Sequence, residues 1–197
     1  MKEYIMTTEF TAAPAALAMV INHFNPEFEL NRENEFKIWQ SAVNLPTRAA
    51  SIFGLAVFAK KQELNPKIIL ENRDYEFPDY RFQGYKKIEI DEAEFSRSMH
   101  VKQAAELNIP IEEMEINLEL VEKLLKQGKI LLIRLNAGVF RDTGSISNYV
   151  IIYAKKGENF SVIDTKIGKL EVKAEDIEKA LKTLSLKKKR SSKMLVF

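Results

Sequence analysis

The stretch MTTEFTAAPAALAMVINHF, from Met6 to Phe24, predicts the first helix of this protein. Thr11 is a residue type that caps helices, and Pro14 suits a first turn, where its missing N–H costs no hydrogen bond. Apolar residues then recur at the spacing of one helix face, at Leu17, Val20, Ile21 and Phe24. We therefore expect a buried first helix that is available to pack on other elements.

The rest of the first third of the chain is also predicted to be helical. Residues 31–43 and 47–64 each carry apolar side chains on one helix face, and Pro46 separates the two segments. The short β-branched run 66–70 predicts a strand. The aromatic and irregular segment 73–87 predicts a surface loop.

The second half of the chain predicts helices followed by a sheet. Residues 91–107 and 117–128 predict helices, the second with Asn117 as its cap and Gly128 as its terminator. Short β-rich runs then predict strands over residues 129–135, 148–154, 159–165 and 169–172.

A hairpin turn at 155–158, a closing helix at 174–184 and a last strand at 193–197 complete the pattern. Helices first and a mostly antiparallel sheet second predict an α+β fold.

Composition and charge limit the classes of function. The chain has 197 residues, 46% of them hydrophobic, which suffices for one core, so a single domain over residues 1–197 is expected. Its 30 Lys and Arg balance 28 Asp and Glu, so charge predicts no nucleic-acid partner. No apolar run approaches the roughly 20 residues that span a bilayer, and the N-terminus lacks a signal-peptide core. We expect a cytoplasmic protein without a membrane span.

The complete lack of cysteine excludes several kinds of site. The chain can form no disulfide, no thiolate zinc site and no thiol nucleophile. Its two histidines cannot by themselves supply a His-rich metal site. The sequence therefore predicts neither a metal nor a cofactor.

Three stretches resemble a known peptidase family. In uncharacterised relatives of the bacteriocin-leader-processing, or double-glycine, peptidases, the opening resembles Q-T-T-[DE]-F-T-C-G-P-A-A-L-A-M, and residues 6–19 here read MTTEFTAAPAALAM. The later motif of that family is a His-Tyr-Val-Val strand and then a strand ending in Asp-Pro, whereas residues 148–165 here read NYVIIYAKKGENFSVIDT. Residues 51–64 resemble its Gly-Leu helix. The resemblance implies a papain-like fold, with a helical N-terminal part packed on the sheet.

The resemblance also implies where the catalytic groups would stand. A cysteine at a helix N-terminus is the nucleophile, a histidine on a facing strand moves the proton, an acid orients it, and a glutamine holds the oxyanion. These roles fall on Ala12, Asn148, Asp164 and Met6, respectively. Alanine offers no nucleophile, an amide does not titrate near neutral pH, and methionine donates no hydrogen bond. The resemblance thus implies a catalytically degenerate member with no intact catalytic residue.

Two alternatives remain open at this point. The first is relocated chemistry at a hydroxyl of Thr11 or Ser147, or at a carboxylate such as Glu9, Asp142 or Asp164. A hydroxyl would need a neighbouring base to become a nucleophile. The spacing of the acids does not indicate a catalytic pair of carboxylates. The second is an inactivated peptidase in which Ala12 replaced a cysteine, but the further changes at Met6 and Asn148 argue against it.

The favoured hypothesis is a peptidase-like protein that works by binding. A cleft between the helical part and the sheet would survive loss of the catalytic groups, and a peptide or protein segment is its natural ligand. We expect Thr11, Ala12, Asn148 and Asp164 to surround the ligand. Ala12 should face Asn148, and Asp164, on the neighbouring strand, should be close enough to touch Asn148 or its surroundings. The basic run from Lys187 to Lys193 is interpreted as a solvated charge cluster, and nothing in the sequence specifies an oligomeric state.

Overall fold

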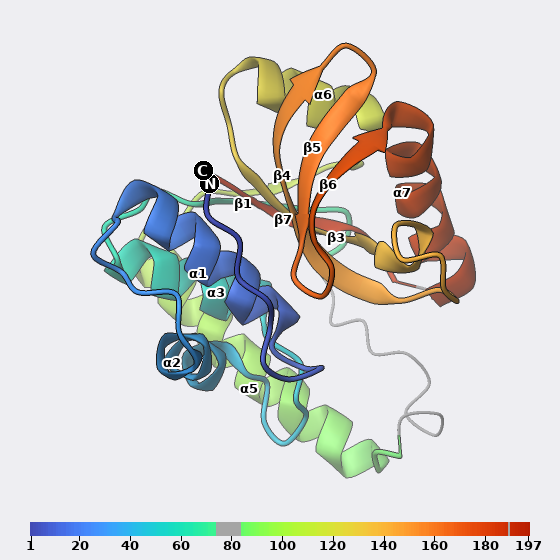
Figure 1. Ribbon diagram of the computed structural model, residues 1–197. Helices are drawn as coiled ribbons and strands as arrows, with labels where there is room; N and C mark the ends of the chain where they lie inside the picture. Colours follow the sequence, from blue (N-terminus) through green and yellow to red (C-terminus); the bar gives the residue numbers. More distant parts are fainter. Residues whose placement is uncertain (74–83, 189) are drawn as a thin grey trace.

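A computed structural model describes residues 1–73, 84–188 and 190–197 (Figure 1). Its first three helices, α1 (Ala12–Phe24), α2 (Arg32–Ala42) and α3 (Ile52–Lys61), confirm the predicted helical first third. The side chain of Asn31 caps α2 by accepting a hydrogen bond from the Asn34 amide at 2.9 Å. Helix α5 (Lys87–Glu106) packs against α3 on the outside of this group.

The sheet has seven strands in the order β2-β1-β7-β3-β4-β5-β6. The pairs are antiparallel except for β1 with β2, which run parallel. The strands are β1 (Lys67–Leu70), β2 (Ile111–Glu113), β3 (Leu131–Asn136), β4 (Ser147–Lys156), β5 (Asn159–Asp164), β6 (Gly168–Lys173) and β7 (Lys193–Val196). The mostly antiparallel sheet confirms the predicted α+β class.

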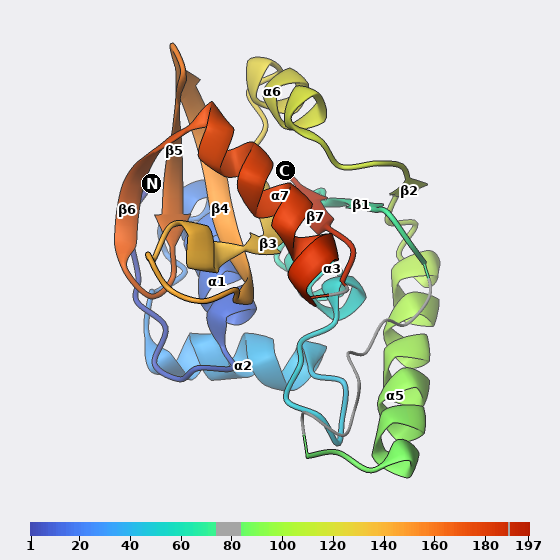
Figure 2. The same cartoon turned by 90° about the vertical axis from the view of Figure 1, so that its right-hand side faces the viewer.

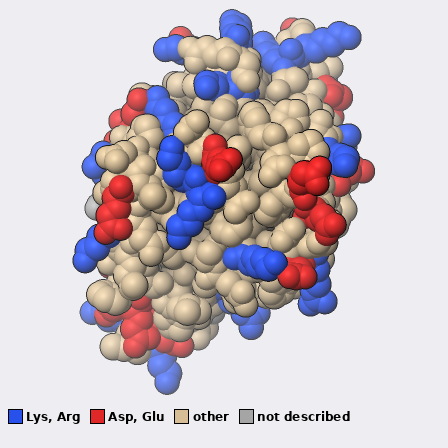
Figure 3. Space-filling view, turned by 90° about the vertical axis from the view of Figure 1, so that its left-hand side faces the viewer, with Lys and Arg blue, Asp and Glu red and all other residues tan. Residues whose placement is uncertain are grey.

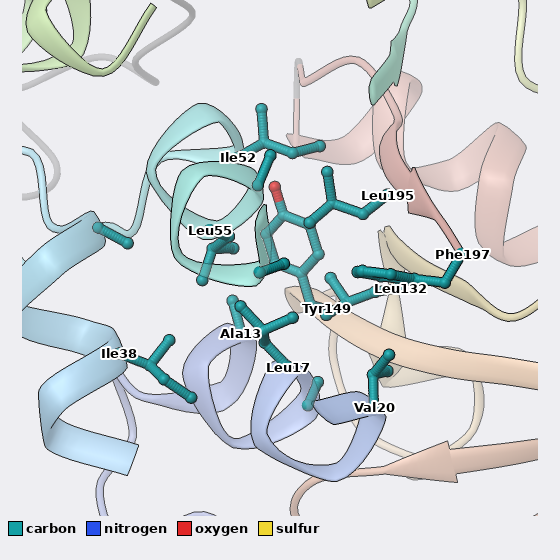
Figure 4. Packing of buried hydrophobic residues seen from close by; sticks show 14 of the residues in the cluster. Ala13, Leu17, Val20, Ile38, Ile52, Leu55, Leu132, Tyr149, Leu195 and Phe197 are labelled. Atoms are coloured by element: carbon teal, nitrogen blue, oxygen red, sulfur yellow. The ribbon is translucent and has the colours of Figure 1, made fainter. Parts of the chain in front are cut away.

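Alternation along the strands builds one hydrophobic core on each face of the sheet. Tyr149 and Ile151 of β4 pack on the face that carries α1 and α3 (Figure 4), whereas Val150 and Ile152 pack on the opposite face. Helices α6 (Leu118–Lys126) and α7 (Ala174–Lys188) belong to that opposite side, and α7 crosses it in Figure 2. Because β4 is an interior strand with side chains in both cores, its register fixes both cores at once.

Most sequence predictions of secondary structure are confirmed, with differences at the edges. The helix predicted at 91–107 begins earlier, at Lys87, because the Glu89 carboxylate accepts a hydrogen bond from the Lys86 amide at 2.6 Å. Strand β2 was not predicted, since its three residues form only by pairing with β1. Of the predicted loop at 73–87, residues 74–83 lie outside the described residues. In the described part of the chain, no helix is long and apolar enough to cross a membrane.

The close crossing of α2 and α3 gives a first testable prediction. A Cβ added at Gly54 would lie 2.7 Å from the Cα of Ala42, which is backbone and cannot yield easily. We expect Gly54→Ala to lower the free energy of unfolding by about 1–3 kcal/mol in urea denaturation, because the two helices must move apart. Gly144→Ala is the control, since an added Cβ there meets nothing within 4 Å. Equal stability of the two variants would contradict this packing.

Candidate functional site

Helix α1 begins at Ala12, and the preceding residue, Thr11, occupies the cap position. The expectation that Thr11 caps the helix is wrong for its side chain, which makes no cap hydrogen bond. The Thr11 hydroxyl instead donates to the Thr8 carbonyl at 3.0 Å and lies 2.8 Å from the Thr8 hydroxyl. Thr11 is fully buried, so it cannot touch a ligand. The first amide groups of α1 are thus left without a side-chain cap from this residue.

A cavity of about 260 Å³ lies beside the start of α1. Ala12 and Ala13 line one side of it, residues 47–50 of the α2–α3 connection line another, and Ser147, Asn148 and Tyr149 of β4 line a third. We call this space the cleft. The structure therefore brings together Ala12 and Asn148, which are 136 positions apart in the chain, on the walls of one cleft.

Asn148 supplies a polar but non-titrating group to the cleft. It stands opposite Leu135 in the pairing of β4 with β3. Its side-chain oxygen accepts a hydrogen bond from the Tyr149 amide at 2.9 Å, and an amide nitrogen with two donor hydrogens remains on the same side chain. The neighbouring Ser147 hydroxyl is buried and has no hydrogen-bond partner among the described residues. This arrangement can hold a carbonyl or carboxylate but cannot relay a proton.

Asp164 lies on the strand next to Asn148, but its side chain does not reach the cleft. Its carboxylate is fully buried and forms a two-point ion pair with Arg141, at 2.9 Å from Nε and 2.8 Å from Nη2. It also accepts a hydrogen bond from the Lys166 amide at 2.8 Å, which makes it a turn former at the end of β5. Asp164 lies on the neighbouring strand as expected, but its carboxylate binds Arg141 rather than Asn148, because a buried carboxylate requires a cation and Arg141 provides it. No sequence signal pointed to Arg141.

Met6 also lies away from the cleft. Its amide donates to the Thr165 carbonyl at 2.8 Å, and its sulfur lies 3.7 Å from the Thr165 hydroxyl. The segment before α1 is anchored by the buried Glu35 carboxylate, which accepts from the Tyr4 hydroxyl at 2.9 Å and from the Thr7 amide at 2.9 Å. Burial, together with the hydrogen bond to Glu35, raises the pKa of Tyr4.

The other residues weighed for relocated chemistry are scattered. Glu9 borders the cleft, but its exposed carboxylate pairs with Lys166 at 3.1 Å. Asp142 is exposed beside a different hollow, and His23 is exposed on α1. His100 lies on α5, where burial lowers its pKa and the Ser41 backbone opposes the shift. Among the described residues that line the cleft there is no histidine, and in the described ranges no group of three acids or histidines could hold a metal.

The cleft carries more positive charge than the sequence suggested. Arg48, Arg134 and Arg190 line it, and Glu9 is the one acid among its described lining residues. Arg190 belongs to the C-terminal basic run, so the interpretation of that whole run as solvated is wrong for this residue. On the face seen in Figure 3, by contrast, acidic and basic side chains are interspersed.

The Arg141–Asp164 pair gives a second testable prediction. Arg141→Met leaves a buried carboxylate without its cation, so we expect the free energy of unfolding to fall by about 3–5 kcal/mol in urea denaturation. Lys182→Met is the matched control, because the Lys182–Glu178 pair is exposed, and its loss is expected to cost about 0.5 kcal/mol or less. If the two variants lost the same stability, Asp164 would not depend on Arg141.

Comparison with known proteins agrees with this geometry. The sequence model of the Peptidase_C39 like family matches residues 1–197. No curated protein matches the chain. An α+β fold that places the start of its first helix beside an interior strand of the sheet is consistent with a peptidase-like protein. The chain belongs to the Peptidase_C39 like family.

Proposed function

We propose that this protein is a papain-like pseudopeptidase that binds a peptide or protein segment in the cleft. One observation carries the proposal: Ala12 and Asn148, which stand where the resemblance puts the nucleophile and the histidine, line the same cleft. A cleft of about 260 Å³ between helices and a sheet is a concave site of the kind that holds an extended segment.

The chemistry of these residues argues against turnover. Thiol peptidases need a thiolate, favoured at a helix N-terminus, and a base that takes up and returns its proton. Ala12 offers a methyl group, the chain contains no cysteine, and Asn148 cannot exchange a proton near neutral pH. Ser147 could supply a hydroxyl, but no histidine stands beside it among the described residues of the cleft.

The same residues retain groups suited to binding. The uncapped amides at the start of α1 and the Asn148 amide can donate hydrogen bonds to backbone carbonyls of a ligand. Thr11 and Asp164, which were expected to touch the ligand, are fully buried and do not line the cleft. We assign ligand contact to Ala12, Ala13 and Asn148.

A binding measurement tests the proposal. The probe is a fluorescein-labelled random octapeptide library, and binding is read by fluorescence anisotropy with the folded state checked by circular dichroism. Ala12→Trp places a large ring in the cleft, so we expect binding at least about tenfold weaker. Gln127→Trp, at the end of α6 on the other side of the sheet, is the control and should bind as wild type does.

If the indole ring introduced by Ala12→Trp destabilises the fold, Asn148→Ala is the second variant. This change removes one hydrogen-bond donor, the side-chain amide of Asn148. Binding that is unaffected by both Ala12→Trp and Asn148→Ala would contradict the cleft as the site.

An activity assay separates the alternatives. We expect no cleavage of the same library by wild type or by Ala12→Cys, because the thiol restored by this change would still lack a base. Cleavage by Ala12→Cys alone would favour an inactivated peptidase. Cleavage by wild type that disappears in Ser147→Ala or Glu9→Gln would favour relocated chemistry.

A further inference from the structure

Helix α5 exposes large apolar side chains on its outer face. Ile88 is 61% exposed, Phe95 67% and Met99 51%. The opposite face of the helix is the buried one, with Ala93 and Ala104 fully enclosed, and α5 packs against α3 at the edge of the molecule (Figure 2). The outer face of a surface helix is ordinarily polar, so apolar residues there indicate an interaction site.

The apolar residues belong to a regular stripe along the helix. Six exposed residues recur at alternating intervals of four and three positions, and we call them the outer stripe: Ile88, Glu92, Phe95, Met99, Lys102 and Glu106. This is the spacing of residues that face a partner in a pair of packed helices. The 20 residues of α5 extend over about 30 Å, so the stripe presents a long contact surface.

The charges inside the outer stripe suit a second copy of the same helix. If two α5 helices pack antiparallel about a twofold axis midway between Phe95 and Met99, then Phe95 of one copy faces Met99 of the other. In the same register, Glu92 of one copy faces Lys102 of the other. The twofold axis forms each contact twice, so the stripe is complementary to itself in both shape and charge.

Other arrangements of two α5 helices pair these residues unfavourably. Parallel helices in register would place Glu92 against Glu92 and Lys102 against Lys102, and like charges in facing positions repel. An antiparallel pair shifted by one heptad would place Glu92 against Phe95, where the carboxylate would be buried without a partner. The charge pattern therefore favours a single antiparallel register.

The residues at the centre of the outer stripe allow the helices to approach closely. Phe95 and Met99 lie between the two small residues Ser96 and Ser98 in the sequence, so no long or charged side chain separates the backbones there. A methionine sulfur also makes favourable contacts with an aromatic ring, which suits the pairing of Met99 with Phe95.

We propose that two copies of the protein associate through α5 as an antiparallel, twofold-symmetric homodimer. This inference goes beyond the proposed function, because no residue of the outer stripe is among the described residues that line the cleft. Each copy contributes only three large apolar side chains, Ile88, Phe95 and Met99, so the interface is small. We therefore expect a weak dimer, with a Kd of about 10–100 µM.

Sedimentation equilibrium of the full chain over about 5–500 µM tests the dimer. Wild type should change from monomer to dimer over this range. Phe95→Glu replaces the central apolar contact with a charge, so we expect its Kd to rise at least about tenfold. Glu94→Gln is the control, because Glu94 is exposed on α5 but lies outside the outer stripe, and it should associate as wild type does. Circular dichroism checks that each variant is folded.

Charge exchange tests the register. Glu92→Lys and Lys102→Glu each place like charges opposite one another, so we expect each variant alone to have a Kd about three- to tenfold higher than wild type at low salt. An equimolar mixture of the two variants should recover the wild-type Kd, because unlike charges face each other again at both positions of the heterodimer. Both residues are exposed, so neither change should unfold the monomer.

The outcomes distinguish the parts of this inference. Wild type that stays monomeric up to about 500 µM would overturn the dimer. A dimer whose Kd is unchanged by Phe95→Glu would overturn α5 as the interface. A dimer weakened by Phe95→Glu, in which the mixture of charge variants associates no better than either variant alone, would overturn the antiparallel register.

Discussion

The register of the interior strand β4, which pairs with β3 and β5, is the constraint on which the rest of the structure depends. Its alternation sends Tyr149 and Ile151 to the core with α1 and sends Val150 and Ile152 to the core with α7. A shift of one residue in its pairing would exchange the two sets and disrupt the packing of both cores. The beginning of this strand, at Ser147, Asn148 and Tyr149, lines the cleft together with the start of α1, so the elements that form the cores also form the cleft.

The buried acids and the cations near the cleft have different surroundings. The buried carboxylates of Asp164 and Glu35 are fully engaged within the fold, by Arg141 in one case and by Tyr4 and Thr7 in the other. The cations around the cleft are instead gathered where described acids are few. A buried carboxylate beside a cation or a hydrogen-bond donor avoids the cost of an unpaired buried charge, so these acids support the fold.

Membership of the Peptidase_C39 like family and the chemistry of this chain lead to different expectations. The family points to peptide handling, whereas a chain without cysteine cannot use a thiol. The two agree if recognition and catalysis depend on different groups. Helix amides, the Asn148 amide and the neighbouring arginines can bind a peptide without any residue that moves a proton.

The sequence by itself determined the helices, most strands, the α+β class and the lack of a thiol, because periodicity, capping residues and composition are local properties. It also pointed to Ala12 and Asn148 through the family resemblance. Only the tertiary structure decided that Asp164 binds Arg141 and that Thr11 is buried away from the cleft. It also decided that Arg190 and Lys193 line a hollow rather than extend into solvent. These outcomes depend on which side chains meet across strands distant in sequence, and a carboxylate or a lysine alone does not reveal its partner.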